Sequence, residues 1–379
     1  FKKILIANRG EIALRIIRTC KEIGIKTVAV YSTADAESLH VRFADEAVCI
    51  GPPASSESYL KMSAILAAAE ITNADAIHPG YGFLSENSNF AAACEQANIV
   101  FIGPPNKAIE VMGDKARAKR AMLEAGVPCI PGYQDEAQDI ETLLNAAENI
   151  GLPVMIKAAA GGGGRGMRLV TESPQLEDAI GLAQSEAQNA FGSSELIIER
   201  AVLRPRHVEV QVFADQLGHV IHLGERDCSI QRRHQKVVEL APSVDLDPTV
   251  RKELCDAAVE IAKAIDYSNA GTVEFLYDMD SNEWFFIEMN PRIQVEHTVT
   301  EQITGIDIVR SQILVAMNKS LHGKDIGIPS QENIPRNGCA IQCRVTTEDP
   351  EKDFAPDYGK ILSYRSAAGF GVRLDGAMG

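Results

Sequence analysis

The chain has 379 residues, of which 45% are hydrophobic and 23% charged, and its formal net charge is −15 at pH 7. These values are typical of a globular protein with two or three domains and exclude a disordered chain. The acidic balance argues against nucleic acid as a partner. No apolar run reaches the length of a membrane span and no secretory signal is evident, so we expect a cytoplasmic location, or an organelle matrix in a eukaryote. The eight cysteines show no paired Cys-x-x-Cys spacing, which favours reduced core residues over a zinc site or a disulfide scaffold.

The first part of the chain, residues 1–112, is predicted to form a domain around a parallel sheet. Residues 3–8 are apolar and extended, residues 11–23 carry apolar side chains at helical spacing, and residues 27–31 form a second strand. Strand, helix and strand in this order indicate a βαβ unit. Further strands are expected at 76–78 and 99–102, and the proline and glycine turns after them are typical of a ligand crevice.

The second domain is expected over residues 113–325 and includes a lid subdomain at about 130–203. Within the lid, four glycines at 161–164 lie between strands expected near 153–157 and 167–170. A dinucleotide motif would open a helix at this point, and no P-loop pattern occurs. We therefore interpret the run as a hairpin whose backbone N–H groups contact an anion beside Lys157; a merely flexible turn is the alternative.

The rest of the chain mixes strands and helices, which indicates an α+β arrangement with antiparallel pairs. Strands are predicted at 207–213, 220–223, 272–277 and 284–288, a helix at 248–265 and a polar loop at 225–239. Residues 326–379 are predicted to form a third, β-containing unit that is truncated, with strand-like segments at 339–345 and in the glycine-rich 359–379.

Basic side chains are concentrated between residues 225 and 239, against the acidic charge of the whole chain. They are Arg226, Arg232, Arg233, His234 and Lys236. Their concentration favours a polyanion site, with a solvated loop as the alternative. Nucleic acid is disfavoured because no aromatic side chains are interleaved with the basic ones.

Residues 287–297 alternate with period two, which in an extended chain places five polar side chains on one side. These are Glu288, Asn290, Arg292, Gln294 and Glu296. The first two are suited to a divalent cation, the next two to a small planar oxyanion, and Glu296 to removal of its proton. A solvated strand is the alternative, and the proline at 291 argues against a fully paired central strand.

Glu274 is a charged residue in an otherwise apolar segment, about one hairpin length before Glu288. Paired strands would bring the two carboxylates side by side, and together with Asn290 they form a plausible platform for magnesium and nucleotide phosphates. A buried glutamate paired with an arginine is the alternative.

Several long motifs occur in one order along the chain. They are Ala-Asn-Arg-Gly-Glu-Ile-Ala at 7–13, His-Pro-Gly-Tyr-Gly-Phe-Leu-Ser-Glu-Asn at 78–87, Glu-Arg-Asp-Cys-Ser-Ile-Gln-Arg-Arg-His-Gln-Lys at 225–236 and Glu-Met-Asn-Pro-Arg-Ile-Gln-Val-Glu-His at 288–297. Over residues 1–379 the chain resembles the ATP-grasp biotin carboxylases, and within them most resembles pyruvate carboxylases. The resemblance implies a mixed α/β class: an ATP-grasp fold with an N-terminal Rossmann-like domain, a mobile lid and a partial C-terminal domain.

The resemblance also implies a reaction. MgATP, or MnATP, phosphorylates bicarbonate to carboxyphosphate, which yields carbon dioxide for the N1′ atom of biotin. The implied ATP contacts are Lys115, Lys157, Gly161, Gly162, Gly163, Gly164, Met167, Glu199, Arg200, Val202, His207, Gln231, His234 and Leu276. Among these, Glu199, Arg200 and Val202 would read the adenine, and Met167 and Leu276 would sandwich it.

The metal ligands implied by the resemblance are Glu274, Glu288 and Asn290. Bicarbonate would be held by Lys236, Arg292, Gln294 and the backbone of Val295, with Glu296 as the general base. Arg344 would stabilise the biotin enolate, with Tyr81 and Gln231 near the ureido ring. Phosphoryl transfer would then depend on positioning and charge neutralisation.

No Ala-Met-Lys-Met acceptor for biotin occurs, so biotin is expected on a carrier domain of another polypeptide or region, with a separate carboxyltransferase and a homodimer or larger oligomer. The same half-reaction in an acetyl-CoA or acyl-CoA carboxylase is an alternative to pyruvate carboxylase. A ligase of the carbamoyl-phosphate synthetase type, which passes activated bicarbonate to ammonia, is a second rival hypothesis. A non-catalytic ATP-binding module is a third.

Overall fold

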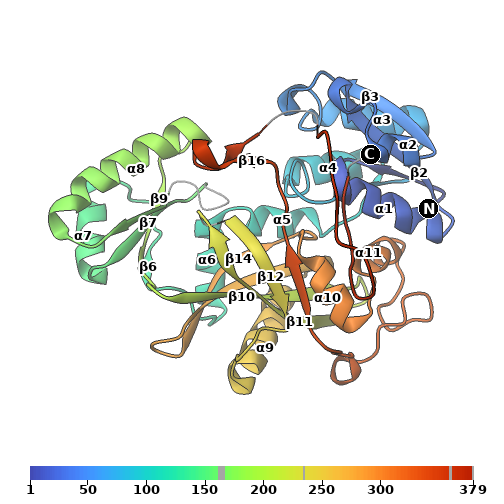
Figure 1. Ribbon diagram of the computed structural model, residues 1–379. Coiled ribbons are helices and arrows are strands. Elements are labelled where there is room, and N and C mark those ends of the chain that lie inside the picture. Colours follow the sequence, from blue (N-terminus) through green and yellow to red (C-terminus); the bar gives the residue numbers. More distant parts are fainter. Residues whose placement is uncertain (161–166, 234, 358–360, 378–379) are drawn as a thin grey trace.

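The computed structural model describes residues 1–160, 167–233, 235–357 and 361–377 (Figure 1). An N-terminal domain and a lid lie on opposite sides of the molecule, and a large sheet lies between and below them in this view. The class is mixed α/β, as predicted, since one parallel sheet occurs together with antiparallel sheets. No helix in the described ranges is long and apolar enough to cross a membrane.

The N-terminal domain is built on a five-stranded parallel sheet of order β3-β2-β1-β4-β5. Its elements are β1 (Lys3–Ile6), α1 (Gly10–Glu22), β2 (Lys26–Ser32), α2 (Leu39–Phe43), β3 (Glu46–Gly51), α3 (Met62–Thr72), β4 (Ala76–His78), α4 (Ser88–Gln96) and β5 (Val100–Phe101). Ile4 and Ile6 pack with α1, and Leu5 packs on the other face with α3 and α4. Both faces of the sheet are thus covered, which explains why its central strand is apolar from Ile4 to Ile6.

The lid contains a four-stranded antiparallel sheet of order β6-β9-β7-β8 with two helices packed against it. Its elements are β6 (Gly132–Tyr133), α7 (Ile140–Ile150), β7 (Val154–Ala158), β8 (Met167–Val170), α8 (Leu176–Phe191) and β9 (Leu196–Arg200). Strands β7 and β8 pair antiparallel, as the hairpin prediction requires. The glycines between them, 161–164, lie outside the described residues.

The largest sheet has six antiparallel strands in the order β14-β13-β10-β11-β12-β15. Its strands are β10 (Pro205–Ala214), β11 (Val220–Arg232), β12 (Gln235–Ala241), β13 (Asn269–Asp278), β14 (Glu283–Asn290) and β15 (Ala340–Cys343). One face is apolar: Val208, Val210 and Val212 of β10 and Val273 and Phe275 of β13 pack in one core cluster that includes α9. The intervening polar residues therefore face the other way, toward the cleft described below.

The remaining elements connect these units. They are α5 (Asn106–Met112), α6 (Lys115–Glu124), α9 (Pro248–Ala264), α10 (His297–Thr304), α11 (Ile308–Ala316), β16 (Glu348–Asp349) and β17 (Ala355–Pro356). Helix α9 begins as expected for its sequence, because Asp247 caps the N–H groups of Thr249 and Val250 and Pro248 takes the first helical position.

Three sequence predictions are wrong in detail. Residues 225–239 are not a polar loop; they form most of β11 and β12, because their charged side chains are neutralised across the sheet. The extended chain ends at Asn290, since Pro291 lacks an N–H group and residues 291–296 form no strand before α10. The segment 340–343 is β15 of the large sheet, and the described residues between 361 and 377 contain no strand because nearly all of them are exposed.

Candidate active site

Four charged residues form one row across neighbouring strands of the large sheet. Arg226 of β11 is the register partner of Glu209 in β10, Glu209 that of Glu274 in β13, and Glu274 that of Glu288 in β14. The predicted pairing of Glu274 with Glu288 is thus confirmed. Three adjacent carboxylates repel one another, so the row is stable only if cations lie among them.

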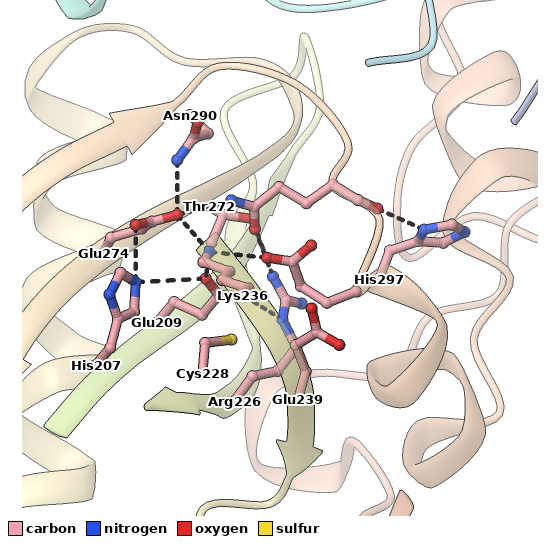
Figure 2. A network of polar contacts seen from close by, with 12 residues as sticks. His207, Glu209, Arg226, Cys228, Lys236, Glu239, Thr272, Glu274, Asn290 and His297 are labelled. Carbon is pink, nitrogen blue, oxygen red and sulfur yellow. Dashed lines mark hydrogen bonds and ion pairs between the residues drawn. The ribbon is translucent and has the colours of Figure 1, made fainter. Parts of the chain in front are cut away.

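Lys236 of β12 is a cation that contacts two carboxylates of the row and a third one outside it (Figure 2). Its Nζ lies 2.5 Å from Glu209, 2.7 Å from Glu274 and 2.8 Å from Glu296. Burial alone would lower the pKa of Lys236, but the three carboxylates raise it well above its ordinary value. Lys236 therefore remains charged and gathers the acidic side chains of three separate segments.

Arg226 is fully buried and uses every N–H group that a guanidinium has. Its Nε donates to Glu209 at 2.6 Å and one terminal nitrogen to Gln211 and Thr300 at 2.8 and 2.9 Å. The other terminal nitrogen donates to Thr272 at 3.2 Å and to the Oε1 atom of Gln294 at 2.9 Å. The predicted polyanion contact is therefore wrong for Arg226, because no donor is left for a ligand.

Glu296 precedes α10 as its N-cap residue, yet its carboxylate does not cap the helix. One oxygen accepts from Lys236 and the other from Arg344 at 2.9 Å, while Nε of Arg344 donates to Glu239 at 2.6 Å. Burial would raise the pKa of Glu296, but Lys236 foremost and then Arg344 lower it to about 2. The side chain is therefore a carboxylate held between two cations.

Glu274 receives donors from several sides. The amide nitrogens of Asn290 and Gln294 donate to its Oε1 at 2.9 and 2.8 Å, and Nε2 of His207 lies 2.8 Å from its Oε2. Burial would raise the pKa of Glu274, but Lys236 and His207 hold it well below its ordinary value. The same carboxylate raises the pKa of His207 against the effect of burial. Glu274 thus stays ionised at neutral pH.

These side chains open into one cleft of about 1250 Å³ between the large sheet, the lid and the N-terminal domain. Residues predicted to contact ATP, bicarbonate, biotin and metal line this cleft together. They are Tyr81, Lys115, Lys157, Met167, Arg200, Val202, His207, Gln231, Lys236, Glu274, Leu276, Glu288, Asn290, Arg292, Gln294, Val295, Glu296 and Arg344. The predicted strand is wrong after Asn290, but the polar side chains of residues 292–296 still meet at this cleft.

Glu199 does not line the cleft. It is buried beneath the wall, where it pairs with Lys119 at 2.8 Å and with Lys157 at 2.5 Å. Burial would raise its pKa, but the two lysines lower it to about 2. Glu199 thus orients Lys157 through its side chain. His234, together with the glycines at 161–164, lies outside the described residues.

The other arginines of the basic run are also paired. Arg232 contacts Glu348 and Arg233 contacts Asp353, so the run is not a cluster of free cations. Of the described basic residues in the run, only Arg232 and Lys236 line the cleft. The partners come from residues more than one hundred positions away along the chain, which a local pattern does not reveal.

The proposed metal ligands fit a divalent cation by their chemistry. Glu274 and Glu288 are adjacent carboxylates on paired strands, and Asn290 follows on the same strand as Glu288, so all three offer hard oxygen atoms at the cleft. Lys115 pairs with Glu288 at 2.8 Å, and Oδ1 of Asn290 accepts from Arg292 at 2.8 Å. These cations balance the site, and the glutamates raise the pKa of Lys115 despite its burial.

The sequence interpretation assigned no role to several buried residues on which the cleft depends: Lys119, Glu209, Gln211 and Glu239. For two of them a signal existed. In Val-Glu-Val-Gln-Val at 208–212 the polar residues alternate with valines, which indicates a strand with one polar face directed at something specific. Lys119 and Glu239 lie among ordinary helix and strand residues and carry no such signal.

Two family models match this chain. Residues 1–109 match the family model of the biotin carboxylase N-terminal domain, and residues 114–324 match that of the carbamoyl-phosphate synthase L chain ATP-binding domain. The chain is 52% identical over 376 residues to biotin carboxylase 1 of Bacillus subtilis, covering 99% of this chain and 82% of that protein. All 379 residues of this chain align with the pyruvate carboxylase of Staphylococcus aureus at 54% identity, and they cover 33% of that protein.

The chain belongs to the biotin carboxylase family.

Solved structures of the biotin carboxylase family share the fold. A biotin carboxylase complex with β,γ-ATP from Campylobacter jejuni has a TM-score of 0.93 and 53% identity, covering 98% of this chain and 81% of that one. The biotin carboxylase domain dimer of 2-oxoglutarate carboxylase from Hydrogenobacter thermophilus, with MgADP, ADP and bicarbonate, has a TM-score of 0.95 and 50% identity, covering 100% and 82%. The fold is therefore the ATP-grasp fold of biotin carboxylases, as the sequence resemblance implied. The chain spans about a third of the pyruvate carboxylases that it matches.

Proposed function

We propose that this chain, as an ATP-dependent ligase, carboxylates biotin with bicarbonate in the first half-reaction of a biotin-dependent carboxylase. The observation that carries the proposal is the position of Glu296, between Lys236 and Arg344 and in the same cleft as Glu274 and Glu288. A carboxylate between two cations, next to a second acidic pair, suits an anion that must lose a proton and then receive a phosphoryl group.

Bicarbonate would bind where Lys236, Arg292 and Gln294 converge, with the N–H group of Val295 as a further donor. In the free chain Lys236 is shared by three carboxylates, so an entering anion takes over part of its charge. The pKa of Glu296 then rises from about 2, because the cation that lowered it is shared. Glu296 becomes a stronger base as the substrate arrives, and it takes the bicarbonate proton.

The deprotonated oxygen of bicarbonate attacks the γ-phosphorus of ATP, ADP leaves, and carboxyphosphate forms. Lys115, Lys157 and His207 would neutralise the phosphate oxygens during this step. Magnesium, held by Glu274, Glu288 and Asn290, would supply Lewis-acid stabilisation of the β- and γ-phosphates. Lys157 is oriented for its role by Glu199, which lies 2.5 Å from its Nζ.

Carboxyphosphate breaks into carbon dioxide and phosphate, and the N1′ atom of biotin attacks the carbon dioxide after losing its proton to the phosphate. Arg344 supports this step by stabilising the negative charge on the ureido oxygen, and its contact with Glu239 fixes its Nε end. Tyr81 and Gln231 lie in the same cleft and would border the ureido ring.

Pyruvate is the proposed final acceptor, on a carboxyltransferase reached by a biotin carrier domain. The support for pyruvate is the 54% identity to the pyruvate carboxylase of Staphylococcus aureus, against 52% to biotin carboxylase 1 of Bacillus subtilis. A homodimer or larger assembly and a location in the cytoplasm or an organelle matrix are part of the same proposal. A domain dimer is named in the Hydrogenobacter thermophilus structure.

The test is bicarbonate-dependent cleavage of ATP by the intact protein, with and without free biotin. Free biotin should stimulate the cleavage, because it removes carbon dioxide and completes the cycle. Cleavage that responds to ammonia instead would favour a carbamoyl-phosphate type of ligase. Nucleotide binding without any bicarbonate-dependent cleavage would favour a non-catalytic module and would refute the proposal.

A further inference from the structure

The turn from Gln294 to His297 lies directly between the proposed bicarbonate site and helix α10. It has no regular secondary structure before His297, yet it carries Gln294 and Glu296, whose side chains reach Glu274 and Lys236. These contacts fix the side chains of Gln294 and Glu296, but they do not fix the peptide unit between Gln294 and Val295. A separate device must therefore set the orientation of that peptide unit.

His297 contacts this peptide unit from the side opposite the ion network. Its Nδ1 lies 2.6 Å from the carbonyl oxygen of Gln294, and its backbone N–H reaches the same oxygen at 3.3 Å. Figure 2 shows His297 on the side of the network away from Glu274 and His207. The His297 side chain is 4% exposed, so the imidazole has few alternative positions.

The tautomer of His297 follows from its partner. A carbonyl oxygen only accepts hydrogen bonds, so Nδ1 must carry the proton. Burial lowers the pKa of His297, which keeps the ring neutral and leaves Nε2 without a proton. Nε2 lies 3.9 Å from Glu301, which is beyond hydrogen-bonding distance. Among the described residues, the contact of Nδ1 with Gln294 is therefore the only hydrogen bond that the ring makes.

The peptide bond between Gln294 and Val295 is trans, so its C=O and N–H groups point in opposite directions. With the carbonyl held toward His297, the N–H of Val295 points away from α10, toward the cleft that Val295 lines. Within the described ranges this N–H donates to no protein acceptor. A donor that is fixed and unused at an anion site is available to the anion.

We propose that His297 is a positioning residue that holds the Gln294–Val295 peptide so that the Val295 N–H is presented to the bound anion. This role rests on the proposed function, because the anion is the bicarbonate of that proposal. His297 itself does not touch the anion; it acts through the carbonyl that it holds.

The chain offers a matched pair of substitutions. In His297→Asn the side-chain amide nitrogen takes the place of Nδ1, so the hydrogen bond to the Gln294 carbonyl is kept. In His297→Gln the amide nitrogen takes the place of Nε2, so that hydrogen bond is lost. We expect His297→Gln to raise the KM for bicarbonate in ATP cleavage at least about tenfold, the equivalent of one hydrogen bond to a charged group. The KM for ATP should stay unchanged, and His297→Asn should remain within about twofold of the unsubstituted protein for both.

Equal behaviour of the two variants, whether both impaired or both normal, would overturn the proposal, since it would show that the donor position does not matter. A parallel measurement on the unsubstituted protein is nitrogen NMR of labelled histidine, which should show His297 protonated at Nδ1. Protonation at Nε2 alone would also overturn it, even if the Gln variant failed to fold. If the unsubstituted protein cleaves no ATP with bicarbonate, the proposed function fails, and the NMR result still decides the tautomer.

Discussion

Strand β1 of the parallel sheet and strands β10 and β13 of the large antiparallel sheet are all largely buried, but they bury different kinds of residue. Strand β1 buries Ile4, Leu5 and Ile6, whereas strands β10 and β13 bury Glu209 and Glu274 at mid-strand. Burying a carboxylate costs free energy unless it is paired and hydrogen-bonded, so a protein gains no stability by preferring it to isoleucine. The difference indicates that the buried charges around the cleft serve the proposed chemistry, while the parallel sheet provides a packed apolar core.

The largest effect is expected on turnover, when a carboxylate of the cleft loses its charge. Glu296→Gln keeps the shape of the side chain but removes its charge and basicity, so bicarbonate-dependent ATP cleavage should fall by about 10²–10⁴-fold. Nucleotide binding should be nearly intact, since Glu296 belongs to the proposed bicarbonate site and not to the proposed nucleotide contacts. Steady-state kinetics and calorimetric titration of ATP measure the two.

The matched control for that substitution is Glu225→Gln. Glu225 is also a buried glutamate of the large sheet, but its partner is Arg251 and it does not line the cleft. The Glu225→Gln protein should be less stable than the unsubstituted protein but should keep its turnover number. Equal loss of nucleotide binding and turnover in Glu296→Gln would count against Glu296 as the base.

The next largest effect concerns stability. Arg226→Met leaves Glu209 buried without its guanidinium partner, so the free energy of unfolding should fall by about 3–5 kcal/mol. In the parallel sheet, Ile4→Val should cost only about 0.5–1.5 kcal/mol. Denaturant unfolding of both variants checks this, and similar losses would mean that the buried ion row is no more critical than ordinary packing.

The sequence predicted those parts of the two sheets that depend on residues close together along the chain, and not those that depend on distant partners. The βαβ opening and the Glu274–Glu288 pair were predictable, because helix spacing and hairpin length are local properties. The strands at 225–239 were not, since Arg226 becomes tolerable in a strand only when Glu209, seventeen residues earlier in the chain, lies opposite it. Likewise, nothing local to Lys119 shows that it meets Glu199.

Acid should destabilise the fold through two carboxylates whose pKa is lowered, Glu296 in the turn before α10 and Glu199 in the lid. The pKa values of Glu296 and Glu199 are about 2 in the folded chain against an ordinary 4.5, so unfolding is accompanied by proton uptake between these values. Their contribution is therefore present above about pH 4.5 and is lost as the pH falls toward 2. Melting temperatures measured across this range should decline less steeply in Glu296→Gln, and an unchanged slope would contradict the assigned ion pairs.

The smallest effect on stability is expected for an exposed ion pair, which serves as a comparison for the buried row. Arg117 of α6 lies 2.9 Å from Glu110, and both side chains are about half exposed, at 49% and 55%. Arg117→Ala should change the free energy of unfolding by less than about 1 kcal/mol, because solvent screens the pair. A loss as large as that of Arg226→Met would show that burial is not what makes the row matter.

The most direct test of the central claim is transfer of isotope-labelled bicarbonate to free biotin by the intact protein. The expected result is ATP-dependent formation of acid-labile carboxybiotin, one ATP cleaved for each label transferred, and loss of the product in Glu296→Gln. ATP cleavage with bicarbonate that leaves biotin unlabelled would contradict the assignment of this cleft to biotin carboxylation.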